Sequence, residues 1–245
     1  LMYALFCHFS LFVRYVKMNS VKNDLTEGSI GRKLISFFLP IAAGTLFQQL
    51  YNAADAIVVG KFVGTIALAA VGGSAAHITN LLIGFFVALS GGSTVVIAQL
   101  FGAKDEESIQ KATGTAIAFC IISGIVLTIV GFAFTPVFLR VLQSPPDTIA
   151  ESTTYLRIVF LGVTAQLLYN MEAGVLQAVG DSKSPFIYLF ICCMINIFLD
   201  LLLVAVFKMG VAGAAIATIA SQIISAVLAT AKLMRSKEAY RITLK

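Results

Sequence analysis

One apolar stretch decides the fold class of this chain, and it runs from Leu34 to Gly60: LISFFLPIAAGTLFQQLYNAADAIVVG. It is longer than the ~20 residues that a helix needs to cross the hydrocarbon core of a membrane. Further stretches of the same kind follow it. Together they lie at about 34–60, 74–101, 112–136, 154–178, 185–207 and 210–232. The sequence therefore predicts an all-α, polytopic membrane protein with six transmembrane helices in one bundle.

The composition indicates the same class of protein. Hydrophobic residues make up 59% of the 245 residues and charged residues only 12%, whereas a soluble domain carries roughly 25% charged residues. So little charge excludes a soluble globule, a disordered chain and a disulfide scaffold. The net charge of +5 is compatible with nucleic acid, but the Lys and Arg residues lie in short clusters between apolar stretches. We therefore expect the lipid bilayer as a partner, and no nucleic acid.

The basic residues predict the orientation of the chain in the membrane. Cytoplasmic loops are enriched in Lys and Arg, and most of the 17 basic residues lie in alternate loops that include both ends of the chain. The opposite side has only Lys61, Arg140, Arg157 and Lys208. We expect a multi-pass protein of the plasma (inner) membrane with both termini in the cytoplasm. Because the chain has no Trp, Tyr155 and Tyr188 are the expected interfacial anchors.

Three parts of the chain are distinguished in this way. They are an N-terminal cytoplasmic segment (1–32), a six-helix transmembrane lobe (33–235) and a basic cytoplasmic tail (236–245). The apolar run within residues 1–17 is too short to span a membrane, and Arg14 and Lys17 follow it, which is the reverse of a secretory signal. We interpret 1–17 as upstream of a native start at Met18. The alternative is a peripheral amphipathic anchor.

Proline and glycine predict where the helices end or bend. Pro136 is expected to end the third helix, and Pro185 occupies a helix-starting position in the fifth. The pair Gly91-Gly92 predicts a bendable point within the second helix.

Three carboxylates fall inside the predicted spans: Asp55, Glu172 and Asp200. An ionisable group at membrane depth is energetically unfavourable, so it is a functional hypothesis by default. The alternative is that such a carboxylate caps a helix or reaches the interface. We favour this alternative for Glu172, because it lies close to Gly180, where the predicted helix has ended.

Asp55 is accompanied by polar residues at helical spacing. Gln48, Asn52 and Asp55 lie at i, i+4 and i+7, so they form one polar stripe, which Tyr51 adjoins. Gln49-Leu50-Tyr51-Asn52 also resembles Gln166-Leu167-Leu168-Tyr169-Asn170 of the fourth predicted helix, as transporter folds built from repeats often show. We expect Gln48, Tyr51, Asn52 and Asn170 to line a cleft.

A second polar pair lies on the fifth predicted helix, where Asn196 and Asp200 are spaced i, i+4. Polar groups in hydrocarbon need partners, so we expect both stripes to face a common interior site. Thr218 could complete it, or could bond only to its own helix. Two carboxylates, a carboxamide and a hydroxyl are hard oxygen ligands, which suit Na⁺ better than soft metals. Two adjacent carboxylates do not both stay charged in a low dielectric, so a proton is the alternative occupant.

These motifs together resemble the multidrug and toxic compound extrusion (MATE) transporters over about residues 18–235. The matching residues are Leu39-Pro40, Gln49-Leu50-Tyr51-Asn52, Asp55 and Val59-Gly60 in the first predicted helix, Gln99 to Asp105 at the end of the second, Gly180 to Pro185 between the fourth and fifth, and Asn196, Asp200 and Gly210 to Thr218 in the last two.

The resemblance implies a cation-coupled antiporter that exports amphipathic or cationic compounds. Members of this family have twelve helices in two lobes. Their cation ligands fall on Asp55, Asn196, Asp200 and Thr218 here, with Na⁺ or a proton as the coupling ion and no other cofactor, whereas Glu172 matches no family ligand. Only the amino-terminal lobe is present, which implies either a truncated gene product, the reading we favour, or a lobe that pairs with a second lobe or a second copy.

Alternative functions follow from the half-length chain. One is an inactive fragment or an assembly partner. Another is a flippase for lipid-linked oligosaccharides, which is less favoured because it predicts a cationic cavity, whereas these spans contain acids. An enzyme is not expected, because the sequence has no nucleophile–base pattern and no phosphate-binding loop.

Overall fold

The computed structural model describes residues 30–236 and residue 241. The predicted segment 1–17, nearly all of 1–32 and most of the tail 236–245 lie outside the described residues. The elements are α2 (Ile30–Phe62), α3 (Thr65–Ala70), the π-helical turn η1 (Val71–Ala75), α4 (Ala76–Gly102), α5 (Glu106–Val141), α6 (Ile149–Ala178), α7 (Lys183–Asp200), the π-helical turn η2 (Leu201–Val206) and α8 (Gly210–Arg235).

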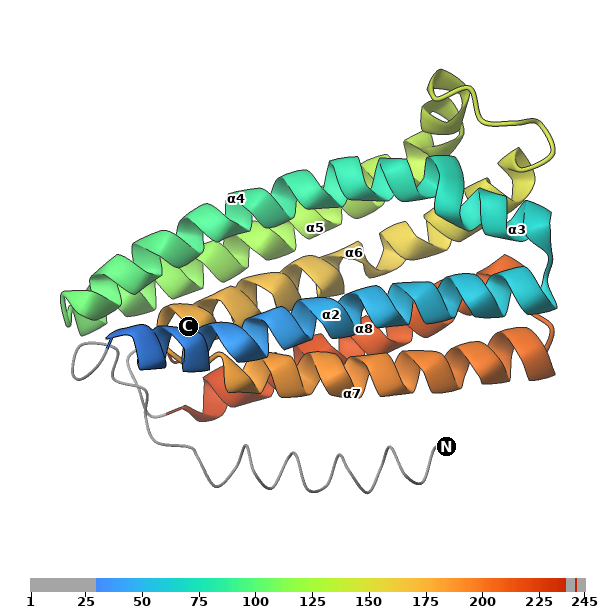
Figure 1. Ribbon diagram of the computed structural model, residues 1–245. Coiled ribbons are helices and arrows are strands. Elements are labelled where there is room, and N and C mark those ends of the chain that lie inside the picture. Colours follow the sequence, from blue (N-terminus) through green and yellow to red (C-terminus); the bar gives the residue numbers. More distant parts are fainter. Residues whose placement is uncertain (1–29, 237–240, 242–245) are drawn as a thin grey trace, which may run out of the picture.

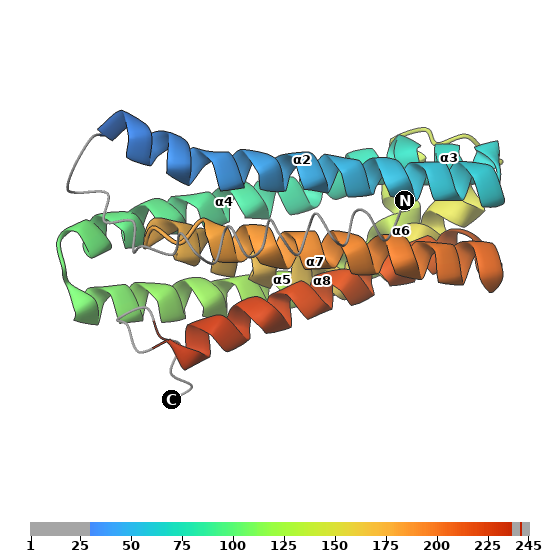
Figure 2. The same ribbon diagram turned by 60° about the horizontal axis from the view of Figure 1, so that its bottom comes forward.

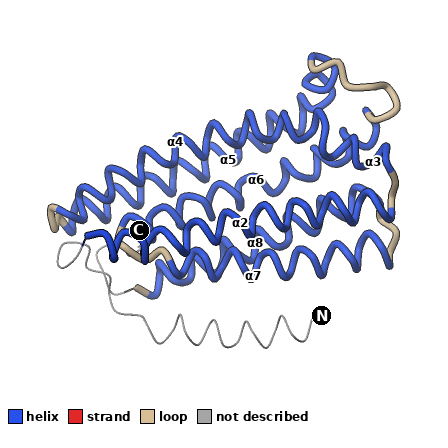
Figure 3. The backbone as a smooth tube through the Cα atoms, in the orientation of Figure 1, coloured by secondary structure: helices blue, strands red, loops and turns tan. Residues whose placement is uncertain are grey.

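The described part of the chain is an all-α bundle, as predicted. It contains six helical segments that are long and apolar enough to cross a membrane. They run side by side along the bundle (Figures 1 and 2), and the loops between them lie at its two ends (Figure 3). Helix α6 packs against α5 on one side and α8 on the other, while α2 packs mainly against α7. Because α6 contacts so many neighbours, its residues occupy the interior.

The bend in the second span lies elsewhere than predicted. Gly91 and Gly92 lie within the continuous helix α4. The chain instead departs from helical geometry at Gly73, whose φ is −88° and ψ is −121°, between α3 and α4. The ring of His77 lies one turn further on and hydrogen-bonds the Gly73 carbonyl oxygen at 2.9 Å. A local polar side chain therefore satisfies a carbonyl group at the break.

The prediction that Pro136 ends the third helix is wrong. Pro136 lies inside α5, which continues to Val141. A proline removes one backbone hydrogen bond from a helix. Pro136 lies in a segment that is long and apolar enough to cross a membrane. In such a segment an end to the helix would leave several backbone groups without partners, so continuation is favoured. Packing against α6 further stabilises α5 beyond the proline.

Helices α5 and α6 approach each other through glycines. A Cβ atom at Gly131 would overlap the ring of Phe160, which is fully buried. A Cβ atom at Gly124 would lie 2.7 Å from the Cα of Thr164. These contacts require the absence of a side chain, so glycine at both positions sets the distance between the two helices.

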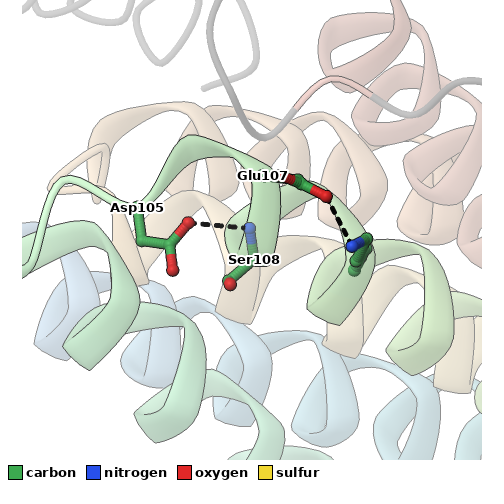
Figure 4. A network of polar contacts seen from close by, with 4 residues as sticks. Asp105, Glu107 and Ser108 are labelled. Atoms are coloured by element: carbon green, nitrogen blue, oxygen red, sulfur yellow. Dashed lines mark hydrogen bonds and ion pairs between the residues drawn. The ribbon is translucent and has the colours of Figure 1, made fainter.

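Helix α5 begins at a capping carboxylate (Figure 4). The Asp105 Oδ1 accepts a hydrogen bond of 3.1 Å from the backbone N–H of Ser108. One turn further on, the Lys111 Nζ lies 2.6 Å from the Glu107 Oε1 in an exposed ion pair. Hydrogen bonds from the side chain and the backbone N–H of Ser108 lower the pKa of Asp105, because they stabilise the charged carboxylate.

This cap leads to a pH-dependent prediction. A carboxyl whose pKa is lowered by folding stabilises the fold above its ordinary pKa, and loses that contribution as the pH falls through its pKa in the folded protein. Asp105→Ala should therefore lower the melting temperature of the detergent-solubilised chain at neutral pH, and less so in acid. Asp105→Asn keeps a cap that does not titrate, so its advantage over Asp105→Ala should be the same at every pH. Equal melting temperatures for all three proteins at neutral pH would contradict the assignment.

Candidate functional site

Two acids from different helices meet in the interior of the bundle. Asp55 on α2 is 9% exposed and Asp200, the last residue of α7, is fully buried. Their side chains lie within hydrogen-bonding reach of each other, and Asn196 lies within reach of Asp55. The Thr218 hydroxyl of α8 donates a hydrogen bond of 3.3 Å to the Asp55 Oδ2. The structure thus brings Asp55, Asn196, Asp200 and Thr218 together from three helices.

Most polar atoms of this acid pair and its amide neighbour lack well-formed hydrogen bonds. Among the described residues, no partner of good geometry is present for the Asp55 Oδ1, for either Asp200 carboxylate oxygen or for the Asn196 amide. Buried polar groups are nearly always satisfied, and a buried charge without a partner is strongly unfavourable. Converging, unsatisfied oxygen atoms fit a bound monovalent cation, or a proton shared between the carboxylates.

Local backbone features place these side chains. The α-helical geometry of α7 ends at Asp200, and the chain continues as the π-helical turn η2. π-helical turns are frequent at functional sites. On α8, a Cβ atom at Gly213 would lie 3.2 Å from the backbone of Leu203, so α8 and η2 are in close contact. Thr218, which also donates to the Ala214 carbonyl oxygen at 3.0 Å, is thereby held against the acids.

Two tyrosines adjoin the acids. Tyr51 of α2 lies near Asp55 and near the side chain of Gln222 of α8. Tyr155 of α6 lies near both acids. The sequence predicted Tyr155 only as an interfacial anchor. Residue spacing shows which side chains share a face of one helix, but not which residues of other helices that face contacts.

A cavity of about 150 Å³, lined by both polar and apolar side chains, opens at Tyr51 between α2, α6, α7 and α8. Three of the four predicted cleft residues, Gln48, Tyr51 and Asn170, line it. Gln166 and Tyr169, from the short internal similarity, line it as well. The two similar segments therefore face one common space.

Asn52 is not part of this cavity wall. Its side chain is exposed, and its Nδ2 donates a hydrogen bond of 3.2 Å to the Gln49 Oε1. The predicted stripe of Gln48, Asn52 and Asp55 is therefore divided. The reason is geometric: an i+4 and an i+3 step rotate in opposite senses around a helix, and the cavity lies on the side of Tyr51.

The interpretation that Glu172 caps a helix or reaches the interface is wrong. Its side chain is fully buried on α6, and the Thr230 hydroxyl of α8 donates a hydrogen bond to its Oε1. It does not join the acid pair.

Comparisons with known proteins show which family this chain is similar to. Residues 40–202 match the family model MatE. The "probable multidrug resistance protein YoeA" of Bacillus subtilis (strain 168) is 33% identical over 207 residues, which are 83% of this chain and 44% of that protein. The "probable multidrug resistance protein NorM" of Thermotoga maritima is 27% identical over 238 residues, which are 94% of this chain and 49% of that protein.

Solved structures of transporters are also similar to this chain. A MOP superfamily transporter from Pyrococcus furiosus superposes with a TM-score of 0.83 at 26% identity, over 92% of this chain and 50% of that one. An outward-facing multidrug resistance MATE family transporter gives a TM-score of 0.82 at 26% identity, again over 92% and 50%. The chain spans about half the length of the curated relatives it matches.

Proposed function

Because this chain belongs to the MatE family and superposes on solved MATE family transporters, we propose that it is one lobe of a multidrug efflux transporter driven by a cation gradient across the plasma membrane. The observation that carries this proposal is the convergence of Asp55, Asp200 and Asn196 in the interior, with oxygen atoms that lack partners among residues 30–236. Ionisable groups buried at membrane depth mark ion pathways by default. Similarity to proteins named for multidrug resistance supports the export of foreign compounds.

The coupling ion in this proposal is Na⁺ or a proton, held by Asp55, Asn196, Asp200 and Thr218. Either ion cancels one of the two negative charges of the acid pair and so removes the repulsion between two buried carboxylates. Asp55 is the member of the group that belongs to α2, the span with the fewest buried residues. Ion binding therefore ties α2 to α7 and α8, and ion release loosens that contact, which changes the shape of the cavity between them.

The cavity points to amphipathic compounds as substrates. Its described lining residues carry amide, hydroxyl, thiol, aromatic and aliphatic groups, and none of them is charged. Such a wall suits a compound with an apolar body and few polar groups. Because the lining includes no Lys or Arg, nothing in it favours the phosphate groups of a lipid-linked oligosaccharide.

Transport by this lobe requires a second lobe. The cavity of about 150 Å³ is smaller than the ~300–1,000 Å³ of pockets that enclose drug-sized ligands. The exposed apolar side chains of α2, such as Leu46, Leu50 and Ile57, offer a face on which a second lobe can pack. A second copy of this chain, or another chain, would supply it.

Gradient-driven release of a dye tests the proposal. Liposomes that contain the chain, alone or fused to the carboxyl-terminal lobe of the Bacillus subtilis relative, are loaded with ethidium and exposed to an inward or outward gradient of Na⁺ or protons. We expect ethidium movement that depends on the gradient and is lost in Asp55→Asn, because the variant lacks one of the two carboxylates that hold the ion. Crosslinking of the chain alone shows whether two copies pair. The absence of gradient-dependent movement in both proteins would refute a role in efflux.

A further inference from the structure

Glu172 is a buried carboxyl group that the proposed efflux mechanism does not use. It lies on α6 shortly before the helix ends at Ala178, and its side chain is 0% exposed. The Thr230 hydroxyl donates a hydrogen bond to the Oε1. The Oε2 is also buried and has no hydrogen-bond partner among the described residues.

The neighbours of Glu172 supply no positive charge. On α5 its neighbour is the Cys120 thiol, which lies 3.5 Å from the Ser90 hydroxyl of α4. On its own helix the neighbour is Tyr169, whose hydroxyl donates to the Pro185 carbonyl oxygen at 2.9 Å.

The basic residue of α8 closest in sequence to Thr230 is engaged elsewhere. The Lys232 Nζ lies 3.9 Å from the Asp181 Oδ2, and both side chains are partly exposed. The described part of the chain shows no ion pair to Glu172. An ionised carboxylate in an apolar interior without a counter-charge is strongly unfavourable, and such a group takes up a proton instead.

Glu172 is remote from the acid pair. Thr218 contacts Asp55, and Thr230 contacts Glu172, on the same helix α8. With a rise of 1.5 Å per residue, these two threonines are separated by about 18 Å along the axis. The two carboxyl sites therefore lie against opposite halves of α8, and the acid pair is the one near the end of α2, after which α3 follows.

We propose that Glu172 is a second proton-binding site, separate from the site formed by Asp55 and Asp200. Its occupant is a proton and not a metal cation, because one carboxyl group, one hydroxyl and one thiol are too few hard oxygen ligands for Na⁺. A proton needs only one oxygen atom, and the Oε2 is available. This proposal does not depend on the proposed efflux function, because Glu172 would bind a proton whether the acid pair binds Na⁺ or a proton.

Release of this proton would change helix packing. Glu172 lies beside an apolar cluster that includes Met171, Val175, Cys120 of α5 and Leu233 of α8. A negative charge at Glu172 would sit against apolar side chains on three helices, which is unfavourable. Deprotonation is therefore coupled to loosening of the contact between α6 and α8.

Carbodiimide labelling of the purified full chain tests this proposal directly. Dicyclohexylcarbodiimide reacts with protonated carboxyl groups in apolar surroundings, and peptide mass spectrometry reports each site. We expect Glu172 to be labelled at neutral pH, to lose labelling as the pH is raised, and to be unaffected by NaCl. The peptides with Asp55 and Asp200 form a separate readout, because protection there by Na⁺ reports on the coupling ion. Protection of Glu172 by Na⁺ would overturn the assignment of a proton.

Infrared spectra give a second measurement that does not rely on access of a reagent. Glu172→Gln keeps the shape of the neutral acid and an acceptor for Thr230, so it should fold with a melting temperature no lower than that of the native chain. It should lose the carbonyl stretch of one neutral carboxyl group at neutral pH. Glu106→Gln, at an exposed position in the first turn of α5, should leave that band unchanged. A neutral-carboxyl band that is the same in Glu172→Gln and the native chain would refute the proposal.

Discussion

Replacing Asp200 with Asn is expected to abolish the stabilisation of the chain by its cation, and to raise its melting temperature when no cation is bound. Asp200 is fully buried, and within the described part of the chain neither of its carboxylate oxygens has a well-formed partner. Asn has nearly the same shape without the charge, so it removes the repulsion from Asp55 and the unfavourable burial of an anion. A cation at 100 times its dissociation constant stabilises the native state by about 2.7 kcal/mol. This contribution should be absent from the variant.

Thermal unfolding in detergent measures both effects. The native chain and Asp200→Asn are compared in NaCl and in choline chloride of equal concentration, and across pH without Na⁺. A rise in melting temperature with Na⁺ identifies Na⁺ as the ion, and a rise on acidification without Na⁺ identifies the proton. Asp147→Asn, at an exposed position between α5 and α6, is the matched control and should behave as the native chain. An Asp200→Asn protein that responds to Na⁺ or acid as the native chain does would exclude the acid pair as the ion site.

Asp55→Asn should also reduce the stabilisation by the cation and raise the melting temperature without a cation, but both changes should be smaller than in Asp200→Asn. Asp55 is 9% exposed and already accepts a hydrogen bond from Thr218. Its charge is therefore less unfavourable than that of Asp200 before any ion binds. In choline chloride, the rise in melting temperature should be larger for Asp200→Asn than for Asp55→Asn. The reverse order would show that burial of the carboxylate does not determine the size of the rise.

The bundle was predictable from the sequence because length and polarity alone determine which segments cross a membrane. Each predicted stretch corresponds to a long apolar helix. The positions at which the helices end or bend were less predictable. Pro136 interrupts a helix in water more readily than in a bundle, where α6 packs beside it. The bend at Gly73 depends on a local hydrogen bond from His77, which residue type alone does not reveal.

Parts of the candidate site were also predictable, because side chains that share a helix face are known from spacing. Asp200 and Asn196 had to face one direction, and the structure places them against Asp55. Contacts between helices were not predictable in this way. Glu172 and Tyr155 lie on α6, and only the packing of α6 against its neighbours shows that the first is enclosed and the second adjoins the acids. A buried acid near a helix end therefore cannot be told from an interfacial one by sequence position.

The packing of α6 depends on Gly131, so Gly131→Ala should strongly destabilise the chain. Its methyl group would overlap the ring of Phe160, which is fully buried and has little room to move. Overpacking is unfavourable by about 1–3 kcal/mol, and three ring atoms of Phe160 within 2.5 Å of the added Cβ atom place Gly131→Ala at the upper end of this range. That cost exceeds the gain of about 1 kcal/mol from replacing Gly by Ala in a helix. Displacement of α6 would also shift Tyr155 relative to the acids. We expect a lower melting temperature, and a loss of the cation-dependent rise in the native chain.

A matched substitution on the same helix separates crowding from helix propensity. Gly114 also lies in α5, and a Cβ atom there would meet nothing within 4 Å, so Gly114→Ala should be neutral or stabilising. Phe160→Leu is destabilising alone because it leaves a cavity, but it makes room for the methyl group of Gly131→Ala. The double variant should therefore be more stable than the sum of the single effects predicts. Additive effects, or equal melting temperatures for Gly131→Ala and Gly114→Ala, would show that the close approach of α5 and α6 does not hold the site in place.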